Sequence, residues 1–176
     1  VEMTTQGGDI AIDAGTTITV ETGGAASSNG GDIVYTAETD LIVGDVDASG
    51  ADSTIAEGSI VLNAVTGNLT VNDQNADGIA LITNAIGEIS IDAGEAIQVN
   101  ASVVTETGNI TIAADQSIVQ GADVAITTQG GDIAINAGTA ITVEIGGAAS
   151  SNGGDIVYTA ETDLIAGDVD ASGADS

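Results

Sequence analysis

The chain has 176 residues, 27 acidic side chains and no Lys, Arg or His, which gives a formal net charge of −27; Cys, Pro, Trp and Phe are also absent. The usual catalytic bases, nucleophiles and soft-metal ligands are therefore missing, which argues against an enzyme and against zinc, copper or iron–sulfur sites. With no cationic side chain we expect no nucleic-acid binding, and without a run of about 18 apolar residues we expect no direct membrane insertion.

In chain order, the first predicted element is a strand within residues 8–14, Gly-Asp-Ile-Ala-Ile-Asp-Ala. Its pattern, Gly-x-Ile-x-Ile-x-Ala with Tyr or Leu sometimes replacing the second Ile, recurs at intervals of 21 to 29 residues. The copies begin at Gly8, Gly31, Gly58, Gly87, Gly108, Gly131 and Gly154. Apolar residues alternate with small or polar ones, which is the period of a β-strand.

Each copy is followed by a second apolar pair, such as Ile18 and Val20, and in several cases by a third, weaker segment, such as Ile79 and Leu81. Two or three short strands in every 21–29 residues predict one turn of a solenoid. We therefore expect an all-β fold, a right-handed parallel β-helix of about seven turns. Stacked turns would align Ile10 and Ile12 with their equivalents in all the other turns as two inward ladders, and Ala14 with its equivalents at a tight corner.

The alternative fold is a string of β-sandwich domains. The sequence also repeats at an offset of 123 residues, which is a suitable size for one such domain. The strands of a sandwich are not internally repetitive, whereas these are. The solenoid is the preferred interpretation.

A longer repeat lies above the short one. Residues 1–53 recur as 124–176, an offset of 123, with six differences: Glu2/Ala125, Met3/Ile126, Asp13/Asn136, Thr17/Ala140, Thr22/Ile145 and Val43/Ala166. We interpret residues 1–176 as one continuous solenoid segment, with a tandem unit of five turns at 1–123 and a partial second copy at 124–176. A larger tandem array is expected.

The charge is high for such a rod. Seven turns at about 4.8 Å each span roughly 34 Å, so the 27 negative charges would lie about 1.3 Å apart along the axis. B-DNA carries one charge per about 1.7 Å. We expect either bound divalent cations or carboxyl groups with raised pKa values to offset the repulsion.

Three Asp-rich motifs could supply such cation sites. Residues 73–78, Asp-Gln-Asn-Ala-Asp-Gly, match the first half of an EF-hand calcium loop, and residues 45–50 and 168–173 are close relatives. Ala56 and Asn84 stand where an EF-hand has its bidentate Glu, so the loops are not complete EF-hands. The predicted Ca²⁺ ligands are Asp45, Asp47, Ser49, Asp52, Asp73, Asn75, Asp77, Asp168, Asp170, Ser172 and Asp175.

The same residues are also good turn formers, and that simpler interpretation stays open. Asp45 and Asp73 each follow a Val by two residues and fall in the two longest turns. We therefore expect two inserted loops that leave the same corner of adjacent turns and share ions.

The runs at residues 8–15 and 108–114 resemble the large repetitive surface proteins of bacteria, including filamentous-haemagglutinin-like adhesins and other giant proteins of β-strand repeats. The resemblance covers essentially the whole chain. It implies a parallel β-helix, export, and a role in adhesion, a matrix or a surface fibre, and it carries over no catalytic residue.

The expected function is structural: a rod or stalk of an extracellular fibre or giant cell-surface protein, stabilised by cations and extended by self-association or by further repeats. The alternative is a calcium-dependent adhesin segment. A polysaccharide-degrading β-helix enzyme is disfavoured, because the acidic pair Glu38 and Asp40 is repeated at Glu161 and Asp163 rather than forming one site, and no basic residue could hold the substrate.

Overall fold

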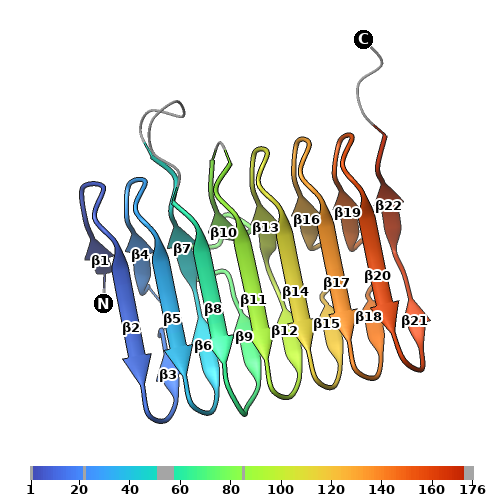
Figure 1. The fold of residues 1–176 in the computed structure, drawn as a ribbon, viewed down its shortest axis with the longest axis horizontal. Coiled ribbons are helices and arrows are strands. Elements are labelled where there is room, and N and C mark those ends of the chain that lie inside the picture. The colour runs from blue at the N-terminus through green and yellow to red at the C-terminus, as the bar shows by residue number, and fades with distance from the viewer. Residues whose placement is uncertain (1, 22, 51–57, 85, 173–176) are drawn as a thin grey trace.

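The computed structural model describes residues 2–21, 23–50, 58–84 and 86–172. These residues form 22 β-strands and no helix (Figure 1). The strands make three sheets in which every neighbouring pair is parallel. Each sheet therefore runs along the whole molecule.

Sheet A contains β1 (Glu2–Thr4), β4 (Ala25–Ser27), β7 (Asp45–Asp47), β10 (Ile79–Ile82), β13 (Ser102–Val104), β16 (Ala125–Thr127), β19 (Ala148–Ser150) and β22 (Asp168–Asp170). Sheet B contains β2 (Ile10–Ala14), β5 (Ile33–Ala37), β8 (Ile60–Ala64), β11 (Ile89–Ala93), β14 (Ile110–Ala114), β17 (Ile133–Ala137) and β20 (Ile156–Ala160). Sheet C contains β3 (Ile18–Thr19), β6 (Leu41–Val43), β9 (Leu69–Val71), β12 (Ile97–Val99), β15 (Ile118–Gln120), β18 (Ile141–Val143) and β21 (Leu164–Ile165).

The chain passes through sheets A, B and C in that order seven times and ends on β22. Each pass is one turn, and successive turns lie side by side along the long axis (Figure 1). The prediction of a parallel β-solenoid of about seven turns is confirmed, with three strands in each turn. In a β-sandwich, strands that follow one another in the chain often pair with each other in the same sheet. Among the described strands, each pairs instead with the strand three positions earlier or later in the chain.

The register of sheet B is the one that the repeats predict. Ile10 pairs with Ile33, Ile12 with Tyr35 and Ala14 with Ala37, and the same columns continue without a shift to β20. Parallel pairing requires turns to stack directly above one another. The predicted alignment of the two ladders and of the Ala column is therefore confirmed.

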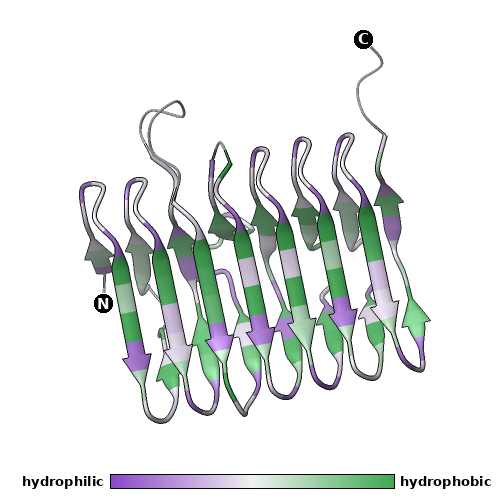
Figure 2. Cartoon of the chain, viewed as in Figure 1, coloured by the Kyte–Doolittle hydropathy of each residue, from purple (hydrophilic) through white to green (hydrophobic). Residues whose placement is uncertain are grey.

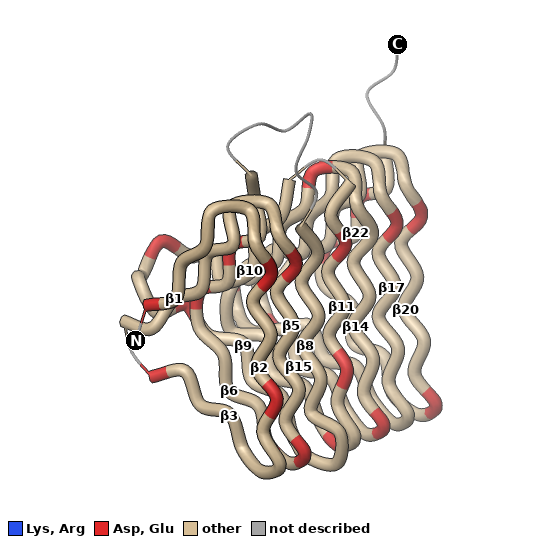
Figure 3. The backbone as a smooth tube through the Cα atoms, turned by 60° about the vertical axis from the view of Figure 1, so that its left-hand side comes forward, with Lys and Arg blue, Asp and Glu red and all other residues tan. Residues whose placement is uncertain are grey.

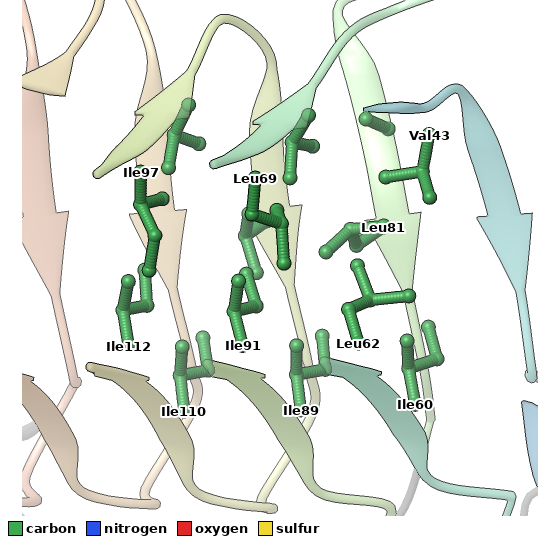
Figure 4. Close-up of a cluster of buried hydrophobic side chains, with 14 of the residues drawn as sticks. Val43, Ile60, Leu62, Leu69, Leu81, Ile89, Ile91, Ile97, Ile110 and Ile112 are labelled. Carbon is green, nitrogen blue, oxygen red and sulfur yellow. The ribbon is translucent and has the colours of Figure 1, made fainter. Parts of the chain in front are cut away.

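In most strands buried residues alternate with more exposed ones, and the buried side chains form one continuous apolar core (Figure 4). Figure 2 shows hydrophobic residues recurring along the stacked strands. Strand β8 is typical, with Ile60, Leu62 and Ala64 fully buried. Aliphatic side chains with a β-branch or a γ-branch fill this narrow interior and favour extended backbone. One turn has no core of its own, so burial comes from stacking.

Core volume is balanced across the turn. Tyr35 is fully buried in sheet B, and the inward residue of sheet A in the same turn is the small Ala26. The turn with Leu62 in sheet B has Val46 in sheet A instead. Constant packing density explains this pairing of large with small, and Tyr35 is a core residue.

Glycine is required at the corner where sheet A leads into sheet B. A Cβ atom on Gly108 would lie 2.0 Å from the carbonyl oxygen of Gly87, and one on Gly131 would lie 2.1 Å from that of Gly108. The Gly that opens each motif after the first thus packs against the carbonyl group of the equivalent Gly in the preceding turn. No other residue fits this approach, which accounts for its recurrence.

Candidate functional site

The predicted ion motif at residues 45–50 is not a loop. Asp45–Asp47 forms strand β7 of sheet A, and Val46 points into the core with 1% of its surface exposed. The alternation that suggested ligand oxygens is the period of a strand with an apolar centre. The prediction of two inserted loops at one corner is therefore wrong.

The two long turns are long at different corners. In one, the extra residues follow β7 and lie between sheets A and B; in the other, they lie between β9 and β10, where sheet C leads into sheet A. Only residues 72–78 form an insertion at the second corner. The two long turns therefore gain their extra residues at different points along the chain, after a strand of sheet A in one and after a strand of sheet C in the other.

The segment Asp73–Gly78 is a compact turn closed by its own side chains. The Asp73 carboxylate accepts hydrogen bonds from the N–H groups of Asn75 (3.0 Å), Ala76 (2.6 Å) and Gly78 (2.7 Å). Asp77 accepts from Ile79 N–H at 2.8 Å. Ala76 and Gly78 have φ values of 66° and 87°, which give the turn its sharp reversal.

Electrostatics in this segment follow from these contacts. Desolvation acts to raise the pKa of Asp73, but the N–H groups of Gly78, Ala76, Asn75 and Asp77 outweigh it, so the pKa lies below its ordinary value. A lowered pKa keeps Asp73 ionised over a wider pH range.

Asp45 lies beside this turn, as the stacking of adjacent corners requires. Its Oδ1 accepts the Gln74 N–H at 3.1 Å. Burial raises the pKa of Asp45, the Gln74 N–H acts in the opposite direction, and the charges of Asp73 and Asp77 add to the rise. Three predicted ligands, Asp45, Asp73 and Asp77, are thus near enough to interact electrostatically.

The remaining predicted ligands form local turns or lie elsewhere. Ser49 N–H donates to Asp47 Oδ1 at 2.8 Å, and Ser172 N–H donates to Asp170 Oδ1 at 2.9 Å. The hydroxyl and the N–H of Ser172 both lower the pKa of Asp170. Asp52 and Asp175 lie outside the described residues; Asn75 donates to Asp77 Oδ2 at 3.1 Å, and Asp168 begins strand β22.

Within residues 2–21, 23–50, 58–84 and 86–172, no three acidic side chains are grouped so that they could hold one metal ion. Binding of Ca²⁺ stays a prediction for this chain.

A row of side-chain acceptors at the corner between sheets A and B was not anticipated. It follows the recurrent Gly and consists of Asp9, Asp32, Ser59, Glu88, Asn109, Asp132 and Asp155. Asp9 Oδ1 accepts the Asp32 N–H at 3.0 Å, and Asp32 Oδ1 accepts the Ser59 N–H at 2.9 Å. Ser59, Asn109 and Asp132 likewise accept a backbone N–H of the next turn, and Glu88 accepts the side-chain amide of Asn109. We call this row the corner ladder.

Buried hydroxyl groups on the inner side of the same corner donate hydrogen bonds to backbone carbonyl groups. They belong to Ser28, Thr83, Thr105, Thr128 and Ser151, all of which are buried. Thr105 donates to Gly87 O at 2.9 Å and Thr128 to Gly108 O at 3.1 Å. In most turns Ser or Thr precedes the Gly by three residues, a signal visible in the sequence.

Gln120 occupies a position in sheet C where the stacked residues are Val99 and Val143. It is 1% exposed, and its Nε2 donates to Val124 O (2.8 Å) and Ala148 O (2.9 Å). Its Oε1 is buried without a partner in the described structure. This residue is the polar exception in an aliphatic column.

The outer surface concentrates charge at the corners. Of the 27 acidic residues, seven lie in described strands: Glu2, Asp13, Asp45, Asp47, Asp92, Asp168 and Asp170. Figure 3 shows acidic residues gathered where strands end. The outer faces of sheets B and C are therefore nearly uncharged.

An open hollow of about 560 Å³ lies where sheet B leads into sheet C, with Asp92, Ala113, Asp115, Asn136 and Glu161 among its lining residues. The carboxylates here are exposed. With no cationic partner in the sequence, the hollow offers only oxygen acceptors and amide groups to a ligand.

No helix among the described residues is long and apolar enough to span a membrane. Comparisons with protein-family models, curated proteins and solved structures gave no match.

Proposed function

We propose that this chain is a segment of a rod-shaped structural protein, built of tandem 123-residue units and located at the cell surface or in an extracellular fibre. One observation carries the proposal. The boundary between the units, at residues 123 and 124, is stacked like the interior of each unit: β16, β17 and β18 pair with β13, β14 and β15 in unbroken register. Units joined in this way extend the rod without a hinge.

The composition supports a structural role rather than catalysis. The carboxylates of Asp9, Asp32 and Asp73 accept backbone N–H groups of their own or the next turn, and the sequence contains no basic or thiol group to act on a substrate. The lack of Lys and Arg also leaves no site for trypsin-like proteases, which suits a durable extracellular material.

A calcium-dependent adhesin segment of the filamentous-haemagglutinin type is the second candidate. It is favoured by the contact of Asp45 with the acidic turn at residues 73–78, where the Gln74 N–H donates to Asp45 Oδ1 at 3.1 Å. In that case ions would stiffen the rod, and domains beyond it would bind the partner.

The rod proposal is tested by length. We expect solution X-ray scattering to show an elongated particle, and a variant extended by one further 123-residue unit to be longer by about 24 Å, five turns of about 4.8 Å, at constant cross-section. A particle that thickens or bends at the added unit, rather than lengthening, contradicts the proposal.

A further inference from the structure

The first turn, β1–β3, has an apolar face directed away from β4–β6. A hollow of about 380 Å³ on this face is lined by Met3, Ile12, Ile18, Thr19, Val20 and Glu21. Met3, Ile12 and Val20 are only partly buried, whereas Ile33, Tyr35 and Leu41 in the next turn are fully buried. The face thus has the side chains of a core without a covering turn.

The chain itself shows what covers such a face. Adding 123 to the lining residues gives Ile126, Ile135, Ile141, Thr142, Val143 and Glu144, five of which are identical in type. These residues belong to β16–β18 and the position after them, and β16–β18 are covered by β13–β15. The observed pairs are Val103 with Ile126, Ile112 with Ile135 and Ile118 with Ile141.

The surroundings of Gly8 also indicate that a further repeat unit covers this face. Its equivalent, Gly131, must lack a side chain because a Cβ atom would lie 2.1 Å from Gly108 O. A Cβ atom on Gly8 would meet nothing closer than Thr5 Cβ at 3.8 Å. Within the described chain, nothing beneath Gly8 requires a glycine, so the residue fits a carbonyl group supplied by another repeat unit.

Backbone donors on this face are also unpaired. The N–H groups of Asp9, Gly15 and Thr16 have no acceptor among the described residues. Their equivalents donate as follows: Asp132 to Asn109 Oδ1 at 2.8 Å, Gly138 to Ala114 O at 2.9 Å and Thr139 to Gln116 O at 2.8 Å. A segment with the sequence of residues 102–123 would offer the same three acceptors, and such an unpaired row is a template for added strands.

We propose that this face of β1–β3 is a docking surface for residues 102–123 of a second repeat unit, with Val103 opposite Met3, Ile112 opposite Ile12 and Ile118 opposite Ile18. The inference rests on the proposed function and deepens it, since it names the segment and the register that join one unit to the next. The carbonyl group of Gly108 in the docked segment would sit against Gly8.

The test adds the segment to the full chain. Residues 102–123 are placed directly before Val1, which reproduces the natural junction of Asp123 with Val124 because Val1 is the equivalent of Val124. We expect amide hydrogen exchange at Asp9, Gly15 and Thr16 to slow by at least about tenfold, as edge amides become paired. A matched control carries Ile112→Asp and Ile118→Asp within the extension and should show no slowing.

Gly8→Ala provides a second readout. It should leave exchange at Gly15 and Thr16 unchanged in the parent chain and abolish the added protection in the extended chain. Unchanged exchange on extension, or slowing that persists in the Ile112→Asp, Ile118→Asp control, would overturn the docking proposal. If the parent chain still scatters as a rod, the proposed function survives that result; a parent chain that is not rod-shaped would overturn the proposed function itself.

Discussion

At the scale of single residues, the solenoid depends on positions where atoms of adjacent turns nearly touch. The recurrent Gly is such a position. The loss of stability when it is replaced depends on whether the backbone of an adjacent turn packs against it. The buried tyrosine is another, because its hydroxyl group is placed in an aliphatic core without a hydrogen-bond partner in the described structure.

Gly108→Ala should destabilise the fold by about 1–3 kcal/mol, because its Cβ atom would lie 2.0 Å from Gly87 O and the two turns would have to separate. Gly8→Ala is the matched control, at the same position of the first turn, and should change stability by less than about 0.5 kcal/mol. Thermal or chemical unfolding followed by circular dichroism measures both. Equal effects of the two substitutions would contradict the proposed contact between turns.

Tyr35 makes stability depend on alkaline pH. Burial raises its pKa to about 12, from an ordinary value of 10.0. Between these values the unfolded chain loses the phenolic proton while the folded chain keeps it, so the free energy of unfolding is level below pH 10 and falls by about 2–3 kcal/mol as the pH rises to 12.

Unfolding at a series of alkaline pH values checks this, with tyrosinate absorbance reporting ionisation. Tyr35→Phe removes the unpartnered hydroxyl and should unfold at neutral pH with equal or slightly higher stability, up to about 1 kcal/mol. The variant should also lose the part of the alkaline decline that Tyr35 causes, and the rest belongs to Tyr158, whose pKa burial also raises. An unchanged decline in Tyr35→Phe would show that Tyr35 is not its source.

At the scale of elements, one local pattern has two structural outcomes. Residues 45–50 and 73–78 share the alternation of acidic and other residues, yet the first begins with a strand and the second is a turn. Val46 in the first and Gln74 in the second stand at the same motif position. The apolar side chain at this position decides the outcome, because it can be buried in the stack.

Val46→Asn should therefore destabilise the chain by about 2–4 kcal/mol, since it places an amide group at a fully packed inward position. Gln74→Asn is the control and should have little effect, because Gln74 is only partly buried and already polar. Denaturant titrations of both variants provide the comparison. An unchanged free energy of unfolding in Val46→Asn would favour the interpretation of residues 45–50 as a loop.

At the scale of the whole molecule, the uncompensated charge of −27 opposes the stacking of turns. Few carboxylates lie on the sheets, and the corner ladder stacks several of them in adjacent turns. Stacking in this fold therefore brings like charges together along the rod, and backbone N–H groups offset only part of the repulsion.

The melting temperature should rise with NaCl, because the screening length falls from about 10 Å at 0.1 M to about 3 Å at 1 M. At equal ionic strength Ca²⁺ should stabilise more than Na⁺, through stronger condensation on the rod. Differential scanning calorimetry with EDTA reversal measures both effects. A melting temperature indifferent to salt would mean that repulsion between the carboxylates is negligible.

Specific ion binding is separable from this general effect. If Ca²⁺ binds beside Asp45, Asp73→Asn should reduce the calcium-dependent rise more than Asp115→Asn, an exposed corner residue that forms no part of the motif. Equal responses of the two variants, and equal effects of Ca²⁺ and Mg²⁺, would remove the calcium-dependent adhesin and leave the structural role.

The sequence alone determined the periodicity, the class of fold, the inward ladders of sheet B and the 123-residue unit. Apolar residues recur every two residues within a strand, and the strands recur about every two dozen residues. Such a pattern buries its apolar side chains when successive turns stack on one another. It also contained the acceptor after each Gly and the hydroxyl three residues before it in most turns, although their roles were not evident. Only the tertiary structure decided that Asp45-Val46-Asp47 is a strand, that the extra residues of the two long turns come at different corners, and that a Cβ atom on Gly8 would meet no carbonyl oxygen among the described residues. The physical reason is that corner lengths and burial depend on which turn lies above and below, and a local motif does not specify its neighbours in the stack.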